Sequence, residues 1–499
     1  MKNLKNITFV LLSFLAITSC SDFLKEDPKS LISTDNFYKT NNDVVAATNA
    51  IYLAMRDDVT GGIAPIWMAE SASDDGKAGG TPVGERLEVD NLIYASRHGF
   101  IRTVWNTAYK AIDRANAVLY YVDTVANPKL NPSIVKRSYA EARFLRAFYY
   151  TRLVQMYGDV PLVLKPTTDE TLYPSRTPKA DVYKQIIEDL QYAEIELTNN
   201  YAYTDANGGR ATKVAAKALL GYVYLVMAGF PMNDASKWQA AADKFNEIIA
   251  NKAQYSVDLM TVYKDIFDPT KKSLNKEYIF YYKGTTGQSA SLLAYTRLQN
   301  WYYAFTSIVP TKEATDSVYE ANDARRFVSL GRKSGSSVVP ITQTGGTVII
   351  NKYIDNLANS NDNANDFHAL RYGDVVLMYA EALIEIGGTA NLDKALTAIN
   401  DVRKAHGGAA MPALTYTSQD DLRQKLRLER RRELMFEGKR WYDLVRWNVF
   451  VPVMQKHMSA EYLKPISDYN YINTDRMLMP LPYIDFINNP NLRPQNPGY

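Results

Sequence analysis

The chain has 499 residues, 46% hydrophobic and 22% charged, which is ordinary for a folded globular protein with room for two or three domains. Its 57 basic residues nearly balance its 54 acidic ones, and no basic run is interleaved with aromatic residues, so nucleic acid is not an expected partner. The sequence contains no HExxH, GxSxG or GxxxxGK[ST] motif, which argues against zinc-protease, α/β-hydrolase and P-loop chemistry.

The N-terminus has the pattern of a bacterial export signal. Two Lys residues precede an apolar run at 7–17, which is too short to span a bilayer. The run ends in small residues directly before Cys20, the only cysteine, and this arrangement resembles a lipobox in which the thiol is lipidated. We therefore predict a signal peptide at 1–19 and a lipid-anchored polar tether at 20–34, with no free thiol left for a disulfide or a metal.

Helical periodicity dominates the rest of the chain, residues 35–499, which we assign to a single domain. The pattern predicts helix pairs with small residues at close approaches, as in 218–222 and 379–383, at a spacing of roughly 34–38 residues per pair, typical of tetratricopeptide-like repeats. The expected fold class is all-α: tetratricopeptide-like helix pairs forming a scaffold, with long irregular loops building a ligand-binding half. The predicted helices span 35–56, 100–125, 133–157, 179–197, 213–228, 236–250, 372–386, 392–404 and 422–447.

The predicted scaffold and the predicted loops alternate along the chain. We place the scaffold at 35–58, 98–254 and 365–450, and the loop-rich ligand half at 59–97, 255–364 and 451–499. Loops this long are uncommon in compact proteins and tend to be functional.

Aromatic residues cluster in the predicted loops among polar side chains. Aromatic rings stack on the C–H faces of sugars, while sugar hydroxyls need polar partners, so these loops are expected to form a carbohydrate-binding surface. A second, irregular hydrophobic core under the loops is the alternative. The candidate ligand-binding residues are Trp67, Tyr282, Trp301 and Tyr302 for stacking, and Asp74, Arg297 and Gln299 for hydroxyls.

The predicted helix at 422–447 carries charges on its inward face. At helical spacing the apolar stripe changes from Leu to Glu429, Glu433 and Glu437. A buried carboxylate needs a cationic partner, so this helix either lines a wet groove or is held in ion pairs. We favour a structural ion-pair network of Glu429, Arg430, Glu433, Glu437 and Arg440, with Arg partners from this helix and from helices such as 133–157.

A metal site and a catalytic site are two alternative roles for the acidic residues. Residues 355–366 are rich in Asp and Asn but lack the spacing, Gly and terminal Glu of an EF-hand, so a polar loop is favoured and no metal or cofactor is expected. The three Glu could serve a glycoside hydrolase. However, they lie side by side on one helix among many Arg, whereas glycosidase carboxylates flank the scissile bond and one of them has a raised pKa.

Several segments, in order and spanning nearly the whole chain, resemble the SusD/RagB family of outer-membrane nutrient-binding lipoproteins of Bacteroidetes. The resemblance implies an all-α protein on the cell surface that acts without catalysis as a lid over a SusC-like TonB-dependent transporter and binds glycans or, in some members, peptides. It fixes no ligand-binding residues. The matching segments are the lipobox at Cys20, WNTAY at 105–109, AEARFLRA at 140–147, YGDVPL at 157–162, RAT at 210–212, LRY at 370–372, MYAEA at 378–382, ERRREL at 429–434, FEGKR at 436–440, PLP at 480–482 and the C-terminal NPNL and QNPGY.

The function expected from these features is binding of an oligosaccharide and its delivery to a SusC-like transporter. A peptide ligand, or an adaptor role in which the helix pairs bind only the transporter, is the alternative. An enzyme is not expected.

Overall fold

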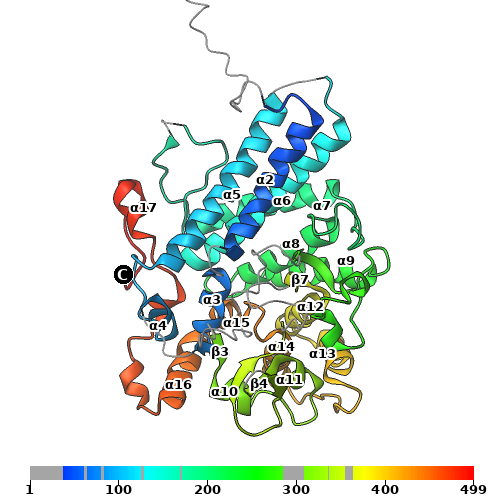
Figure 1. Ribbon diagram of the computed structural model, residues 1–499, viewed down its shortest axis with the longest axis vertical. Helices are drawn as coiled ribbons and strands as arrows, with labels where there is room; N and C mark the ends of the chain where they lie inside the picture. The colour runs from blue at the N-terminus through cyan, green and yellow to red at the C-terminus, as the bar shows by residue number, and fades with distance from the viewer. Residues whose placement is uncertain are drawn as a thin grey trace, which may run out of the picture.

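The computed structural model describes residues 37–60, 64–79, 84–124, 128–168, 171–284, 308–334, 337–353 and 364–499. Long helices occupy one end of the molecule, and short strands and helices gather at the other (Figure 1). The scaffold helices are α2 (Asn41–Thr60), α5 (Gly99–Thr124), α6 (Pro132–Tyr157), α7 (Lys179–Glu196), α8 (Lys213–Ala228), α9 (Lys237–Ala250), α12 (Tyr372–Ile386) and α13 (Thr389–Gly407).

Within the described residues these helices pack as four pairs: α2 with α5, α6 with α7, α8 with α9, and α12 with α13. The first helix of each pair also contacts the first helix of the next pair, from α2 to α6 to α8 to α12. Each pair therefore stacks on its neighbour, as in tetratricopeptide-like repeats. The predicted all-α class is confirmed.

Local sequence explains where several scaffold helices begin and how closely they pack. Asn131 caps α6 by accepting the amide of Ser133, and Thr212 caps α8 in the same way. Gly221 is required between α8 and α9, because a Cβ there would lie 2.6 Å from the ring of Phe245. Small residues at these positions let the paired helices approach, as the sequence predicts.

The segments expected to be loop-rich contain short strands and helices. Strand β2 (Tyr278–Tyr282) pairs antiparallel with β7 (Phe367–Arg371), and β1 (Gly76–Ala78) pairs with β3 (Ile308–Pro310). In a third sheet β4 (Leu330–Ser334) lies between β5 (Ser337–Pro340) and β6 (Thr347–Ile350). The α-helices described in these segments are α3 (Ala64–Ser71), α4 (Glu85–Asp90), α10 (Lys312–Asp316), α11 (Ala324–Ser329), α16 (Phe450–Tyr462) and α17 (Tyr483–Asn488).

The prediction of one helix at 422–447 is wrong. The chain forms α14 (Gln419–Leu434), turns, and resumes as α15 (Arg440–Arg446). Phe436 and Gly438 in the turn have φ of 66° and 70°, a left-handed conformation that ends a helix. The last carbonyls of α14 are taken by distant side chains, because Lys352 donates to the oxygens of Glu433 and Met435 at 3.2 and 2.8 Å.

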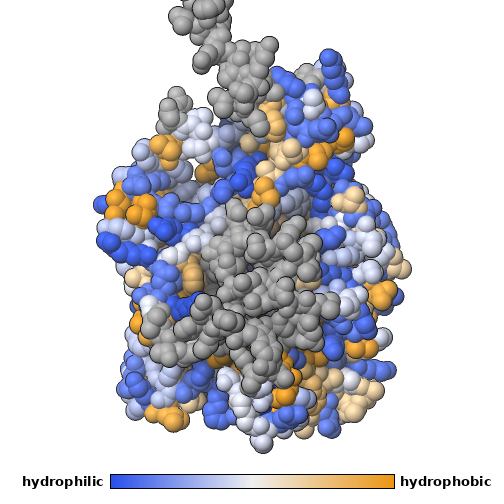
Figure 2. All heavy atoms as spheres, viewed as in Figure 1, coloured by the Kyte–Doolittle hydropathy of each residue, from blue (hydrophilic) through white to orange (hydrophobic). Residues whose placement is uncertain are grey.

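The visible surface mixes polar and apolar residues. Figure 2 shows a small apolar group at the edge that carries α17, where Ile484 and Ile487 are 49% and 48% exposed. Exposed apolar residues of this kind are common on folded proteins. Among the described residues, no helix is both long enough and apolar enough to cross a bilayer.

Candidate ligand-binding site

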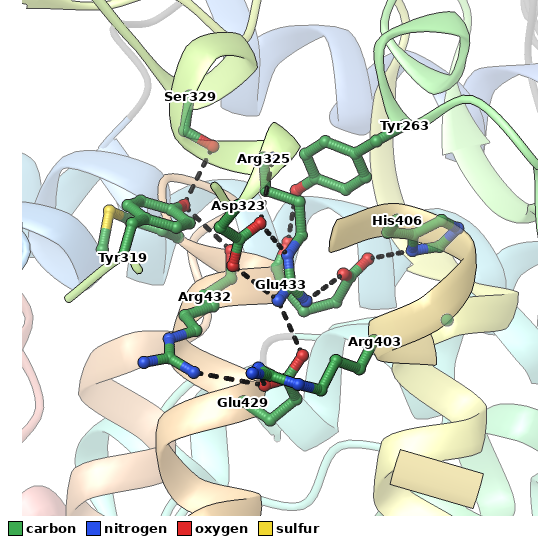
Figure 3. A network of polar contacts seen from close by, with 12 residues as sticks. Tyr263, Tyr319, Asp323, Arg325, Ser329, Arg403, His406, Glu429, Arg432 and Glu433 are labelled. Atoms are coloured by element: carbon green, nitrogen blue, oxygen red, sulfur yellow. Dashed lines mark hydrogen bonds and ion pairs between the residues drawn. The ribbon is translucent and has the colours of Figure 1, made fainter. Parts of the chain in front are cut away.

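The predicted carboxylates Glu429 and Glu433 of α14 lie at the centre of a buried charge network (Figure 3), to which Glu437 of the following turn also belongs. Glu429, Glu433 and Glu437 are at most 1% exposed. Arg325 on α11 contacts Glu429 at 2.7 Å and Glu433 at 3.1 Å, and Arg371 at the end of β7 contacts Glu433 at 2.7 Å and Glu437 at 2.8 Å. The network therefore joins α14 to two elements far away in the sequence.

Further cations surround the same carboxylates. Arg403 on α13 pairs with Glu429 at 3.0 Å, and Lys352 pairs with Glu437 at 2.8 Å. In the described part of the chain these partners come from α11, β7, α13 and the segment after β6. Arg432 of α14 itself also lies 3.5 Å from Glu429, as predicted, whereas no partner comes from the described residues of α6, contrary to the sequence interpretation. On α6, Arg146 pairs instead with Asp189 of α7 at 2.8 Å.

His406 on α13 lies between two carboxylates of this network. Its Nδ1 is 2.8 Å from Glu433, and its Nε2 is 2.8 Å from Glu277, which precedes β2. Burial alone would lower the pKa of His406, but Glu433 and Glu277 outweigh burial and raise it to about 9. His406 is therefore an imidazolium at neutral pH.

The same pairing keeps the acidic groups ionised. Burial opposes ionisation, yet His406 and Arg371 lower the pKa of Glu277 to about 2 and hold that of Glu433 well below its usual range. Against burial, Arg371 and Lys352 lower the pKa of Glu437 to about 2. None of these carboxyl groups is a proton donor near neutral pH, which is what a glycosidase acid must be.

Arg430 and Arg440, the other two residues predicted for the network, form ion pairs of their own. Arg430 contacts Asp374 at 2.6 Å and Asp443 at 2.7 Å. Arg440 donates to both carboxylate oxygens of Asp74, at 2.7 and 2.8 Å, and Arg431 also reaches Asp74, at 3.0 Å. Asp74, a candidate for sugar hydroxyls, is 1% exposed and already holds two guanidinium groups.

A recess lies beside the charge network, between the scaffold and the β2–β7 pair, with about 690 Å³ of empty space, open solvent included. Tyr282, a predicted ligand residue, lines it from β2, and its hydroxyl accepts a hydrogen bond from Arg152 Nη2 at 3.1 Å. Tyr222 of α8 donates to Gln155 of α6 at 2.8 Å on the same lining. The full lining is Ile66, Phe148, Thr151, Arg152, Gln155, Leu219, Tyr222, Tyr282, Phe367, Ala369, Leu370, Glu437, Gly438, Lys439 and Tyr442.

The turn between α14 and α15 forms one wall of this recess, and α3 supports the turn. Glu70 of α3 accepts the amide of Gly438, and Ile66, one helical turn earlier on α3, lines the recess. Burial, with Asp75 nearby, raises the pKa of Glu70 to about 8. Lys439 completes the wall by donating to the carbonyl of Ala369 at 2.5 Å.

Sequence reasoning missed most of the recess. Phe148, Thr151, Arg152 and Gln155 lie three and four residues apart on α6, so they share one face of that helix. This mixed aromatic and polar stripe on α6 was the available signal. No sequence pattern indicated that the turn after α14 lines the recess, because a continuous helix was predicted there.

The structure describes only part of the remaining predicted ligand-binding and anchor residues. Trp67 lies on α3. Cys20, Arg297, Gln299, Trp301 and Tyr302 lie outside the described residues, so their roles stay predictions.

The acidic loop at 355–366 is described only at its end. Asp366 is buried, accepts from the hydroxyl of Tyr278 at 2.6 Å and pairs with Lys272 at 3.0 Å. Within the described ranges, no group of three or more His, Cys, Asp or Glu is arranged to hold a metal ion.

A stacked helical-repeat scaffold carrying a second half of short strands and loops, with a recess between the two, defines the class of this protein. Residues 189–499 match the profile of the SusD family, and residues 83–225 match a profile described as starch-binding associating with outer membrane. The chain belongs to the SusD family.

Individual relatives align with this chain over nearly its whole length. SusD-like protein P2 of Formosa agariphila is 30% identical over 533 aligned residues that cover 99% of each chain. A SusD superfamily structure from Parabacteroides distasonis superposes with a TM-score of 0.76 at 24% identity, over 94% of this chain and all of that one. A structure described as a laminarin binding SusD-like protein gives a TM-score of 0.74 at 24% identity, over 93% of this chain and all of that one.

Proposed function

We propose that this protein is a lipid-anchored outer-membrane protein, facing the cell exterior, that binds an oligosaccharide and delivers it to a SusC-like TonB-dependent transporter. It acts by binding and not by catalysis. Membership of the SusD family, the lipobox-like sequence at Cys20 and the name of the laminarin-binding relative support this proposal.

The observation that carries the proposal is the composition of the recess. The rings of Tyr282, Tyr222 and Phe148 offer faces on which pyranose C–H groups stack, and the guanidinium of Arg152 offers donors for hydroxyls. Flat rings interspersed with a few polar groups are the usual composition of a carbohydrate site.

The charge network supports binding over catalysis. Its carboxylates are saturated by cations, and the pKa of Glu437, which borders the recess, is lowered to about 2 by Arg371 and Lys352 against the effect of burial. A carboxyl group held in this way does not protonate a glycosidic oxygen at neutral pH.

Native electrophoresis in gels containing single soluble polysaccharides tests the proposal. Laminarin and starch belong in the panel with chemically different polymers. We expect at least one polymer to retard the protein and its oligosaccharides to bind with micromolar to millimolar affinity, about −8 to −4 kcal/mol. The products are then examined for shortened chains, and none is expected.

Two results would overturn the proposal. Binding of peptides with no retardation by any polysaccharide would select the peptide-binding alternative. Co-purification with a barrel transporter, with no measurable affinity for either ligand class, would select the adaptor role.

A further inference from the structure

A second cavity, separate in its chemistry from the recess, lies between the scaffold and the C-terminal segment. Its empty space is about 780 Å³, open solvent included, and only Gln155 and Tyr442 are shared with the recess. Its walls are Val154, Gln155, Gly158, Lys179, Tyr183, Val226, Phe230, Pro231, Met232, Trp441, Tyr442, Val445, Arg446, Thr474, Met477 and Leu478.

Most of this lining is apolar or aromatic. Phe230, Pro231 and Met232 come from the connection after α8, and Met477 and Leu478 come from the C-terminal segment. Such walls bury the apolar part of a ligand rather than the hydroxyl-covered faces of a sugar.

Several polar groups of the lining lack a partner among the described residues: those of Lys179, Tyr183 and Trp441, and the hydroxyl of the exposed Thr474. Lys179 and Tyr183 lie four residues apart on α7, hence on one face, and neither the ammonium nor the hydroxyl has a hydrogen bond or an ion pair there. Trp441 of α15 is 1% exposed, and its indole Nε1–H is buried without an acceptor. Tyr183 is also buried, at 3% exposed.

Two other polar residues of the lining, Arg446 and Gln155, already have partners. Arg446 is held by Glu381 and by Asp443, the latter at 2.8 Å. Gln155 donates to the carbonyl of Thr151 at 3.1 Å and accepts from Tyr222. Every unpaired group is therefore able to donate a hydrogen bond, and one of them carries a positive charge.

From this juxtaposition we propose that the cavity is a second binding site, for a small molecule with a flat apolar body and one anionic head. The body packs against Phe230, Met232 and Trp441, and the head accepts from Lys179 and Tyr183. Lys179 is partly exposed, and a charge-assisted hydrogen bond from its ammonium, with a second hydrogen bond from the Tyr183 hydroxyl, gives the head affinity as well as orientation.

Fluorescence titration with 8-anilinonaphthalene-1-sulfonate, an aromatic anion, tests the proposal on the purified full chain. We expect one saturable site. Lys179→Gln should weaken binding of this probe about tenfold or more, since it removes a charge-assisted contact, and should leave binding of the neutral N-phenyl-1-naphthylamine unchanged. Val226→Trp, which fills the cavity, should abolish binding of both probes.

Two variants serve as matched controls. Lys184→Gln removes an exposed Lys of the same helix, and Tyr282→Ala alters the recess; both should keep the affinity of the wild type for the anionic probe. Equal affinity for the anion in Lys179→Gln and wild type would overturn the proposal. Retained binding in folded Val226→Trp, judged by an unchanged circular dichroism spectrum, would overturn it as well.

Discussion

At the scale of single residues, the charge network depends on complete pairing. Glu433 is fully buried and contacts Arg325, Arg371 and His406 together. Taking charges out of water is expensive, and the mutual attraction of the ions offsets that cost only while every partner is present. Removing one member of the network leaves an uncompensated charge in the interior. The effect is measured as a change in the free energy of unfolding.

Glu433→Ala should lower the free energy of unfolding by about 3–5 kcal/mol, because it leaves the three cations without this carboxylate. Urea denaturation measures the change. Glu385→Ala is the matched control: its pair with Arg423 is 22% exposed on both sides, so a loss below about 1 kcal/mol is expected. The folded Glu433→Ala protein should keep its affinity for ligand. Equal losses in the two variants would contradict the account.

The stability of the protein should also depend on pH through His406. Its folded pKa of about 9 exceeds the ordinary 6.5, so its stabilising contribution is complete below pH 6.5 and is lost as pH rises through 9. The difference in unfolding free energy between wild type and His406→Gln should therefore shrink from pH 6.5 to 9. A difference that stays constant across this range would show that His406 is not charged in the folded state.

The contribution of Glu277 and Glu437 to stability has the opposite dependence on pH. Their folded pKa of about 2 lies below the ordinary 4.5, so their contribution is present above pH 4.5 and is lost as pH falls through 2. Wild type should accordingly lose stability below pH 4.5 more steeply than Glu437→Gln does in urea denaturation. Parallel pH profiles of the two proteins would contradict this assignment.

At the scale of elements, the sequence correctly predicted the helices whose positions depend on local periodicity. The helices from 100 to 250 and at 372–386 were located to within a residue or two, because apolar stripes and capping residues such as Asn131 act locally. The buried carboxylates of α14 were predicted from their four-residue spacing.

Features set by distant partners were not predicted. Tyr278–Tyr282 was taken as part of an aromatic loop, yet it is a strand buried throughout, because β7 pairs with it from far along the chain. The cations that meet Glu433 come from Arg325 and Arg371, which no local pattern connects to α14. The turn after α14 is likewise stabilised by Lys352.

A substitution of Gly438 tests whether the conformation of the turn after α14 affects binding in the recess. Gly438→Ala places a side chain at a φ of 70°, which costs about 1–2 kcal/mol, and should weaken glycan binding because the turn lines the recess. Gly345→Ala meets a similar φ of 80° in open space before β6 and should cost similar stability without changing affinity. Thermal unfolding and calorimetric titration of both variants measure the two effects. Unchanged affinity in Gly438→Ala would show that the turn does not contribute to the glycan-binding site.

At the scale of the whole molecule, the scaffold and the second half meet at the recess, and the proposed anchor precedes both. Cys20→Ala should release the protein from the membrane fraction, because lipidation of this thiol is the proposed attachment. Lys25→Ala, in the predicted tether, should leave the protein attached. Immunoblots of membrane and soluble fractions measure the distribution, and attachment of Cys20→Ala would refute the predicted anchor.

The central claim, that the recess binds a glycan, is tested most directly by isothermal titration with an oligosaccharide of the polymer that retards the protein. Tyr282→Ala and Tyr222→Ala should each weaken binding at least tenfold, about 1.4 kcal/mol, by removing a stacking ring. Tyr120→Ala, at a 43% exposed position on α5, should bind as wild type does. Wild-type affinity in both recess variants would contradict the claim.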